Sequence, residues 1–121
     1  MALVKTIQGS GNAGQTAQAI VGFVTKAQTA TAAAQGGQTL PTSVVEYSSS
    51  TANYGPTLPS DSAPGDKYWI ANTSANTIKV WPASGFKING GSADAALSIA
   101  TLKSAVFISL GDGNWFAILT A

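Results

Sequence analysis

The sequence predicts a mainly β protein, a compact antiparallel β-sandwich or barrel with an extended N-terminal arm. From Lys67 onward, short apolar runs are separated by turn residues about every ten residues, as in antiparallel sandwiches and barrels. Residues 49–66 are dense in Ser, Gly and Pro, which excludes a helix there. Residues 1–40 are dominated by Gly, Ala, Gln and Thr, and Phe23 is their one aromatic residue.

We therefore expect an arm or adaptor over residues 1–40 and a β module over residues 41–121. Within the arm, residues 15–27 fit a short amphipathic helix, but Gly22 and the β-branched residues also allow a strand. Residues 9–14 (GSGNAG) have the glycine spacing of a dinucleotide-binding loop. No acidic residue follows at the distance where such a loop needs one, so this stretch is interpreted as flexible arm.

Seven short strands are expected in the module. The first covers residues 44–47 and is followed by the long irregular loop at 49–66. The others are expected at residues 68–71, 77–81, 86–88, 96–99, 105–110 and 115–119. Asn89-Gly90 and Asp112-Gly113 supply the left-handed positions that two-residue hairpin turns require.

The last two strands are apolar on both faces. Val106 and Ile108 alternate with Phe107, and Phe116 and Ile118 alternate with further apolar residues. A strand that is apolar on both faces must be covered on both, and a chain of 121 residues has few spare elements for this. We therefore expect self-association through Phe107, Phe116 and Ile118.

The low charge content indicates a surface that packs against other protein subunits. Only 9% of the residues are charged and the net charge is +1, which suits a protein packed against copies of itself or a larger assembly. The six Lys residues are scattered, so nucleic-acid binding is not expected. No window approaches the 18 uninterrupted apolar residues of a membrane span.

Residues for catalysis are scarce. The chain has no His and no Cys, which excludes Ser-His-Asp and Cys-His catalysis and thiolate or imidazole metal sites. Asp61 and Asp66 could form a carboxylate pair or, with Ser62, bind calcium, but Asp beside Ser, Pro and Gly usually serves turn formation. We expect no enzymatic activity, no cofactor and no metal.

Aromatic side chains offer one further binding chemistry. An aromatic ring can stack on the flat apolar face of a sugar, although packing in a β core is the alternative for each of them. The candidate glycan-binding residues are Tyr54, Tyr68, Trp69 and Trp81.

Several segments of the module resemble small virion proteins of tailed bacteriophages. They are residues 65–72 (GDKYWIAN), 78–85 (IKVWPASG), 88–90 (ING) and 115–118 (WFAI). In that family the pattern G-D, then I-x-V-x-P-x-x-G-x-x-I-N-G, then a closing G-x-W forms a compact β module that is commonly oligomeric. Such proteins occur as capsid decoration proteins, head fibres and tail-associated modules.

The resemblance implies a capsid decoration (cement) protein, made in the host cytoplasm, that binds the virion's capsid surface. We expect a homotrimer whose partner is the major capsid protein, with the arm anchoring it to the shell. The alternative is a receptor- or carbohydrate-binding module of a tail fibre. The anchoring residues expected in the arm are Leu3, Val4, Ile7, Ile20, Val21 and Phe23.

Overall fold

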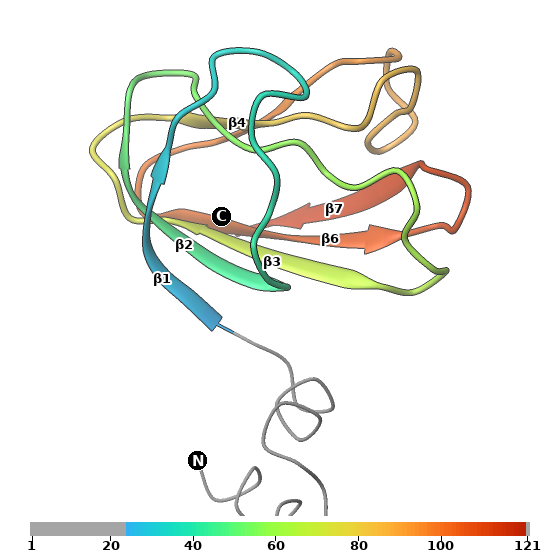
Figure 1. The fold of residues 1–121 in the computed structure, drawn as a ribbon, viewed down its shortest axis with the longest axis horizontal. Helices are drawn as coiled ribbons and strands as arrows, with labels where there is room; N and C mark the ends of the chain where they lie inside the picture. Colours follow the sequence, from blue (N-terminus) through green and yellow to red (C-terminus); the bar gives the residue numbers. More distant parts are fainter. Residues whose placement is uncertain (1–23, 121) are drawn as a thin grey trace, which may run out of the picture.

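The computed structural model describes residues 24–120, which form two layers of β structure without a helix (Figure 1). One layer is a five-stranded sheet in the order β1-β2-β3-β6-β7, and the other contains the two-stranded sheet β4-β5. The strands are β1 (Val24–Ala30), β2 (Val44–Ser50), β3 (Lys67–Asn72), β4 (Ile78–Val80), β5 (Leu97–Ile99), β6 (Lys103–Ser109) and β7 (Trp115–Leu119).

The large sheet is mixed. β3, β6 and β7 pair in antiparallel fashion, as do β4 and β5. β1, β2 and β3 are parallel to one another, so the prediction of a wholly antiparallel fold is wrong for these three strands. Parallel strands need long crossover connections, and residues 31–43 and 51–66 supply them. The sheet is open, with β1 and β7 at its two edges, which rules out the barrel alternative.

Part of the predicted arm is built into this module. β1 pairs with β2, and its last residue, Ala30, is buried. Residues 24–27 are strand rather than helix, whereas residues 15–23 lie outside the described part of the chain. β1 is polar, and its neighbours help to hold it: Thr25 Oγ1 bonds Thr42 Oγ1 at 2.7 Å, and Ala27 N–H donates to Glu46 Oε1 at 3.2 Å.

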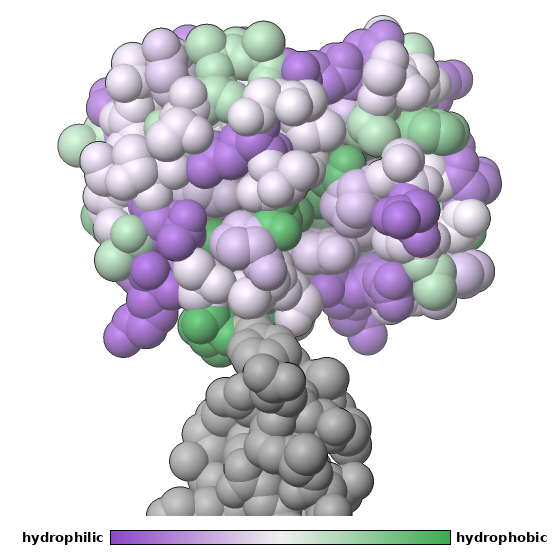
Figure 2. Space-filling view, viewed as in Figure 1, coloured by the Kyte–Doolittle hydropathy of each residue, from purple (hydrophilic) through white to green (hydrophobic). Residues whose placement is uncertain are grey.

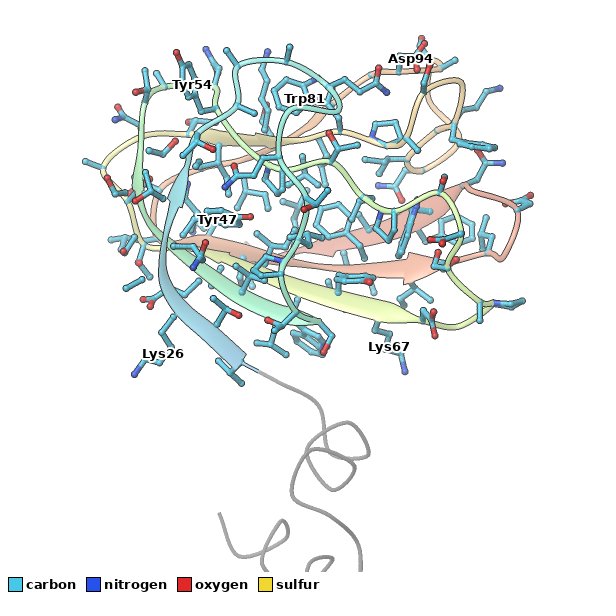
Figure 3. All side chains as sticks on the ribbon, viewed as in Figure 1. Lys26, Tyr47, Tyr54, Lys67, Trp81 and Asp94 are labelled. Atoms are coloured by element: carbon cyan, nitrogen blue, oxygen red, sulfur yellow. The ribbon has the colours of Figure 1, made fainter. Side chains whose placement is uncertain are left out.

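The layer that faces the five-stranded sheet is assembled largely from extended loops. Parallel bridges join Thr39 to Thr57 and Thr57 to Trp81, next to the β4-β5 pair. The hydrophobic core fills the space between the two layers, and Tyr47 lies within it (Figure 3). Its fully buried large side chains include Val45, Tyr47, Leu58, Ile70, Ile78, Val80, Ile99, Phe107 and Trp115.

A buried amide ties the two layers together. Asn72, at the end of β3, donates from Nδ2 to the carbonyl oxygens of Asn76 and Ile99, at 2.8 and 2.9 Å. Its Oδ1 accepts from the backbone N–H and the hydroxyl of Ser74. Because both ends of the amide are satisfied, its burial stabilises this arrangement instead of penalising it.

The two expected turns differ in their use of left-handed residues. Asn89 and Gly90 both have positive φ, at 56° and 67°. In the β6–β7 connection the left-handed residues are Gly111 and Gly113, and the Asp112 carboxylate accepts from Asn114 N–H at 3.0 Å. The strand expected at residues 86–88 is reduced to a bridge between Ile88 and Trp115. No helix within residues 24–120 is long and apolar enough to cross a membrane.

Candidate interaction surface

One row of apolar residues crosses the whole five-stranded sheet on the side away from β4 and β5. Adjacent strands pair Val24 with Val44, Val44 with Trp69, Trp69 with Val106, and Val106 with Ile118. The residues next to them in the sequence point to the opposite side of the sheet, where the core lies. We call this set the central row, and this side of the sheet the outer face.

Three of the five residues in the central row are largely exposed, and the other two, Val44 and Val106, are half-buried. Val24 is 66% exposed, Trp69 53% and Ile118 63%. A second, shorter row follows the same face, where Lys67 pairs with Ile108 and Ile108 with Phe116, which is 54% exposed. Large apolar side chains gathered in this way on one face usually mark an interaction site.

Trp69 stands between two shallow hollows. One, of about 170 Å³, is lined by Ser104 of β6 and by residues of β1, β2 and β3 that include Val24, Val44 and Ala71. The other, of about 220 Å³, is lined on the β6 and β7 side, with Val106 and Ile118 among its residues. Trp69 and Ser104 line both hollows, so the two depressions lie beside Trp69 and adjoin at Ser104.

Charged side chains lie two residues before and two residues after the central row along the strands. Lys67 precedes Trp69 on β3 and Glu46 follows Val44 on β2, and Figure 3 shows Lys26 and Lys67 projecting on the outer side of the sheet. Glu46 is engaged within the chain, because its Oε2 accepts from the Thr73 hydroxyl at 3.0 Å. The middle of the face remains uncharged.

Both edge strands are blocked by a side-chain amide. At β1, Gln38 Nε2 donates to Thr29 O at 2.9 Å and its Oε1 accepts from Thr31 N–H at 3.0 Å. At β7, Asn89 Oδ1 accepts from Ala117 N–H at 2.8 Å and its Nδ2 donates to Ala117 O at 3.3 Å. Each amide occupies backbone groups that another strand would need for edge-to-edge pairing.

The structure separates the residues expected to self-associate. Phe116 and Ile118 lie on the outer face. Phe107 has no exposed surface and packs in the core of its own chain, so its assignment to this surface is corrected. Along β6 the outward residues are Val106 and Ile108, which alternate with the buried Phe107. Trp69 belongs to this surface by register, a relation that appears only once β3 and β6 are paired.

The candidate glycan-binding aromatics do not form one platform. Trp69 lies on the outer face, and its neighbour Tyr68 points to the other side and packs edge-on against Trp115, with ring centroids 5.7 Å apart. Burial, with Asp66 and Asp61 nearby, raises the pKa of Tyr68. Tyr54 and Trp81 lie in the facing layer (Figure 3).

Tyr68 also lines a hollow of about 210 Å³ between the layers. The hydroxyl-bearing side chains around it belong to Thr39, Thr57 and Ser60, and the apolar ones include Leu40. Figure 2 views the layers edge-on and shows a largely polar or neutral surface, with strong hydrophobic colour in its hollowed middle and at its lower margin. The expected anchoring residues Leu3, Val4, Ile7, Ile20, Val21 and Phe23 lie outside the described residues.

The carboxylates mainly organise loops. Asp66 Oδ2 accepts from Ala63 N–H at 2.9 Å. Asp94 Oδ1 accepts from Gly85 N–H at 2.6 Å and from Gln35 Nε2 at 3.1 Å, and these two bonds lower the pKa of Asp94. Among residues 24–120, no three acidic side chains gather into a group that could hold a metal ion.

Comparison with known proteins does not assign a function to this surface. Comparison of the chain with models of protein families, with curated proteins and with solved structures gave no match. The sequence pattern and the outer face are therefore the grounds for a functional hypothesis.

Proposed function

We propose that this chain is a non-enzymatic structural protein of a tailed-bacteriophage virion, a capsid decoration protein that binds the outer shell as a homo-oligomer and stabilises it. The observation that carries the proposal is the exposed apolar outer face, with its central row on all five strands of the large sheet. Such a face suits a protein that works by packing against other subunits.

Two further features support assembly through this face. Gln38 and Asn89 block the sheet edges, which disfavours growth by strand addition. The low charge content reduces both the repulsion between copies and the cost of removing water from their surfaces. The resemblance of the module to small phage virion proteins supplies the setting.

The proposal assigns different tasks to two parts of the chain. The outer face joins copies of the protein, and the apolar residues of the N-terminal arm contact the major capsid protein. A protein that binds only the assembled shell stabilises that shell by mass action.

Co-sedimentation with shells that lack the protein tests this proposal. The full chain should pellet with the shells and raise their thermal stability, whereas a variant without residues 1–23 should stay in the supernatant. A second variant keeps the length of the arm and replaces its six anchoring residues by Ser. It should also lose binding, because these side chains make the contact. A full chain that ignores shells overturns the proposal, and a truncated chain that still pellets removes the role of the arm.

A tail-fibre carbohydrate-binding module is the second candidate. The hollow beside Tyr68 favours it, because an aromatic ring and several hydroxyl groups can together hold one sugar ring. Titration with host surface polysaccharide should shift the fluorescence of Trp115, which packs against Tyr68. A Trp115→Phe variant identifies that signal, and no shift with any host polysaccharide would count against this function.

A further inference from the structure

We propose that residues 15–23, the stretch of the arm directly before β1, dock on the outer face of their own chain and cover Trp69 until another protein draws the arm away. We call this stretch the docking segment. The inference goes beyond the proposed function by assigning an occupant to the outer face in the free chain. It rests on the proposed function only for the event that releases the segment, which is binding of the arm to the shell.

The attachment point of the docking segment favours this occupant. β1 begins at Val24, which is itself a member of the central row and is 66% exposed. The strand ends at the buried Ala30, so it runs from the margin of the outer face toward the facing layer (Figure 1). The docking segment therefore joins the module at the margin of the outer face, whereas the hollow beside Tyr68 lies on the other side of the sheet.

The composition of the docking segment matches that of the surface. The segment carries no charged residue, and its large apolar side chains belong to Ile20, Val21 and Phe23. The middle of the outer face is likewise uncharged, between Lys67 on one side and Glu46 on the other. Docking therefore removes apolar surface of both parts from water without removing a charge from it.

The docking segment is long enough to cover the central row. Neighbouring strands lie about 4.8 Å apart, so Trp69 on the third strand lies roughly 10 Å from Val24. An extended chain advances about 3.3 Å per residue, so Val21 can reach the strand of Trp69 and earlier residues can reach β7. Gly22 has no Cβ and so permits the sharp turn that folds the segment from the line of β1 onto the face.

The hollows of the outer face suit single side chains of such a segment. The hollow of about 170 Å³ is lined by Val24, Val44, Trp69 and Ser104 among others, and it adjoins the second hollow at Ser104. The side chain of Ile20 or Val21 can fill the first hollow against the indole. Small pockets along a sheet accept side chains of an extended segment better than the broad surface of another domain.

The area of the outer face favours an attached segment over a second copy. The exposed parts of Val24, Trp69, Phe116 and Ile118 amount to about 500 Å². Two copies packed through this surface would bury roughly 1,000 Å² in total, which is less than the about 1,200 Å² at which stable interfaces begin. An attached segment is present at an effective concentration of about 1 mM. At micromolar protein concentrations it therefore outcompetes a second copy.

The outer face and the shell then compete for the same side chains. Ile20, Val21 and Phe23 are among the residues proposed to contact the major capsid protein, and they cannot make both contacts at once. Binding of the arm to a shell uncovers the outer face, and copies held side by side on that shell can join through it. In solution the face stays covered and the chain stays a monomer.

Acrylamide quenching of tryptophan fluorescence tests the docking. Of the three tryptophans, Trp69 is 53% exposed, Trp115 is 1% exposed and Trp81 is half-buried, so quenching reports mainly on Trp69. The triple variant Ile20→Ser/Val21→Ser/Phe23→Ser keeps the length of the arm. It should raise the quenching constant about twofold, because a docked segment shields the indole at least half of the time.

The matched control is the triple variant Leu3→Ser/Val4→Ser/Ile7→Ser. It removes the same number of apolar side chains from the arm but leaves the docking segment intact, so its quenching should equal that of the wild type. Trp69→Phe in both backgrounds should abolish the difference, which assigns the signal to Trp69. Equal quenching of the wild type and the docking-segment variant overturns the proposal, and so does an equal rise in the two triple variants.

Light scattering on the same samples identifies whose segment is docked. The wild-type chain should give a mass of 12.2 kDa while Trp69 is shielded. A dimer or larger oligomer with a shielded Trp69 would assign the face to a second copy and overturn docking within one chain.

Failure of this inference and failure of the proposed function give different results. A wild-type chain that pellets with shells, but whose Trp69 is quenched as strongly as in the docking-segment variant, overturns the docking alone. A monomer with a shielded Trp69 that ignores shells leaves the docking in place and removes the decoration function.

Discussion

The buried hydroxyl of Tyr47 lowers the free energy of unfolding. Its ring has no exposed surface, and its hydroxyl has no hydrogen-bond partner among the described residues. Burial raises the pKa of Tyr47 from 10.0 to about 12. An unpartnered buried hydroxyl costs free energy that a partnered one does not.

We predict that Tyr47→Phe raises the free energy of unfolding by about 1 kcal/mol at neutral pH, because it removes that unpartnered hydroxyl. Urea unfolding at fixed protein concentration measures this. A loss of stability of similar size would show that the hydroxyl has a partner.

The same substitution should change the alkaline limit. Between pH 10 and about 12 the unfolded chain loses the Tyr47 proton while the folded chain keeps it, so stability falls as the pH rises through this window. The loss should reach about 2 kcal/mol in the wild type and be smaller in Tyr47→Phe, where Tyr68 still contributes. Parallel curves for the two proteins would contradict this assignment.

Gly55 is required by a close approach of two backbones. A Cβ at this position would overlap the carbonyl oxygen of Lys79, where the loop after β2 packs against β4. We predict that Gly55→Ala costs more than about 2 kcal/mol, because backbone atoms cannot move aside as a side chain can. Gly91→Ala, whose Cβ meets ordinary contacts, is the control and should change stability little. Equal unfolding midpoints for the two variants would contradict this.

At the scale of elements, the edge amides can be tested together. We predict that Gln38→Ala with Asn89→Gly leaves the fold intact but frees the backbone groups of Thr29, Thr31 and Ala117 at the sheet edges, so that the protein aggregates on mild heating. Glycine at position 89 keeps the positive φ, so the change isolates the amide. Light scattering against temperature measures aggregation, with each single variant for comparison. A double variant that stays as soluble as the wild type would show that the edges are protected by other means.

Strand positions were predictable where apolar alternation and turn residues coincide, as for β2, β3 and β4 to β7. β1 was only partly predictable: a strand was one of two alternatives for residues 15–27, but its Thr, Lys, Ala and Gln residues carry no strand pattern. It is held by pairing with β2 and by Glu46 and Gln38. Parallel pairing was also hidden, since it depends on the path of the two crossovers. The Phe107 error came from a strand that is apolar on both faces, where alternation alone cannot say which face is inside.

For the whole molecule, the low charge content predicts stability that depends little on salt. With 9% charged residues, raising sodium chloride to 0.5 M should change the free energy of unfolding by less than about 0.5 kcal/mol, because screening has few interactions to weaken. Thermal unfolding monitored by circular dichroism tests this. A shift of several kcal/mol would reveal an electrostatic network that the composition conceals.

Two layers around one core were predictable at this scale, because few arrangements bury so many short apolar runs in a chain of this length. The outer face was only partly predictable. Phe116 and Ile118 signalled it, whereas the alignment of Val24, Val44 and Trp69 arises from strands distant in sequence.

The side-chain amide of Asn89, which bonds to the β7 edge, is also a site of slow chemical degradation. Asn89 is followed by Gly90, a neighbour too small to shield the side chain, and asparagine amides are among the least heat-stable groups in proteins. Deamidation would convert the donor that holds Ala117 O into a carboxylate oxygen, which repels that carbonyl. Slow ageing would thus free Ala117 O at the β7 edge for contacts with other chains.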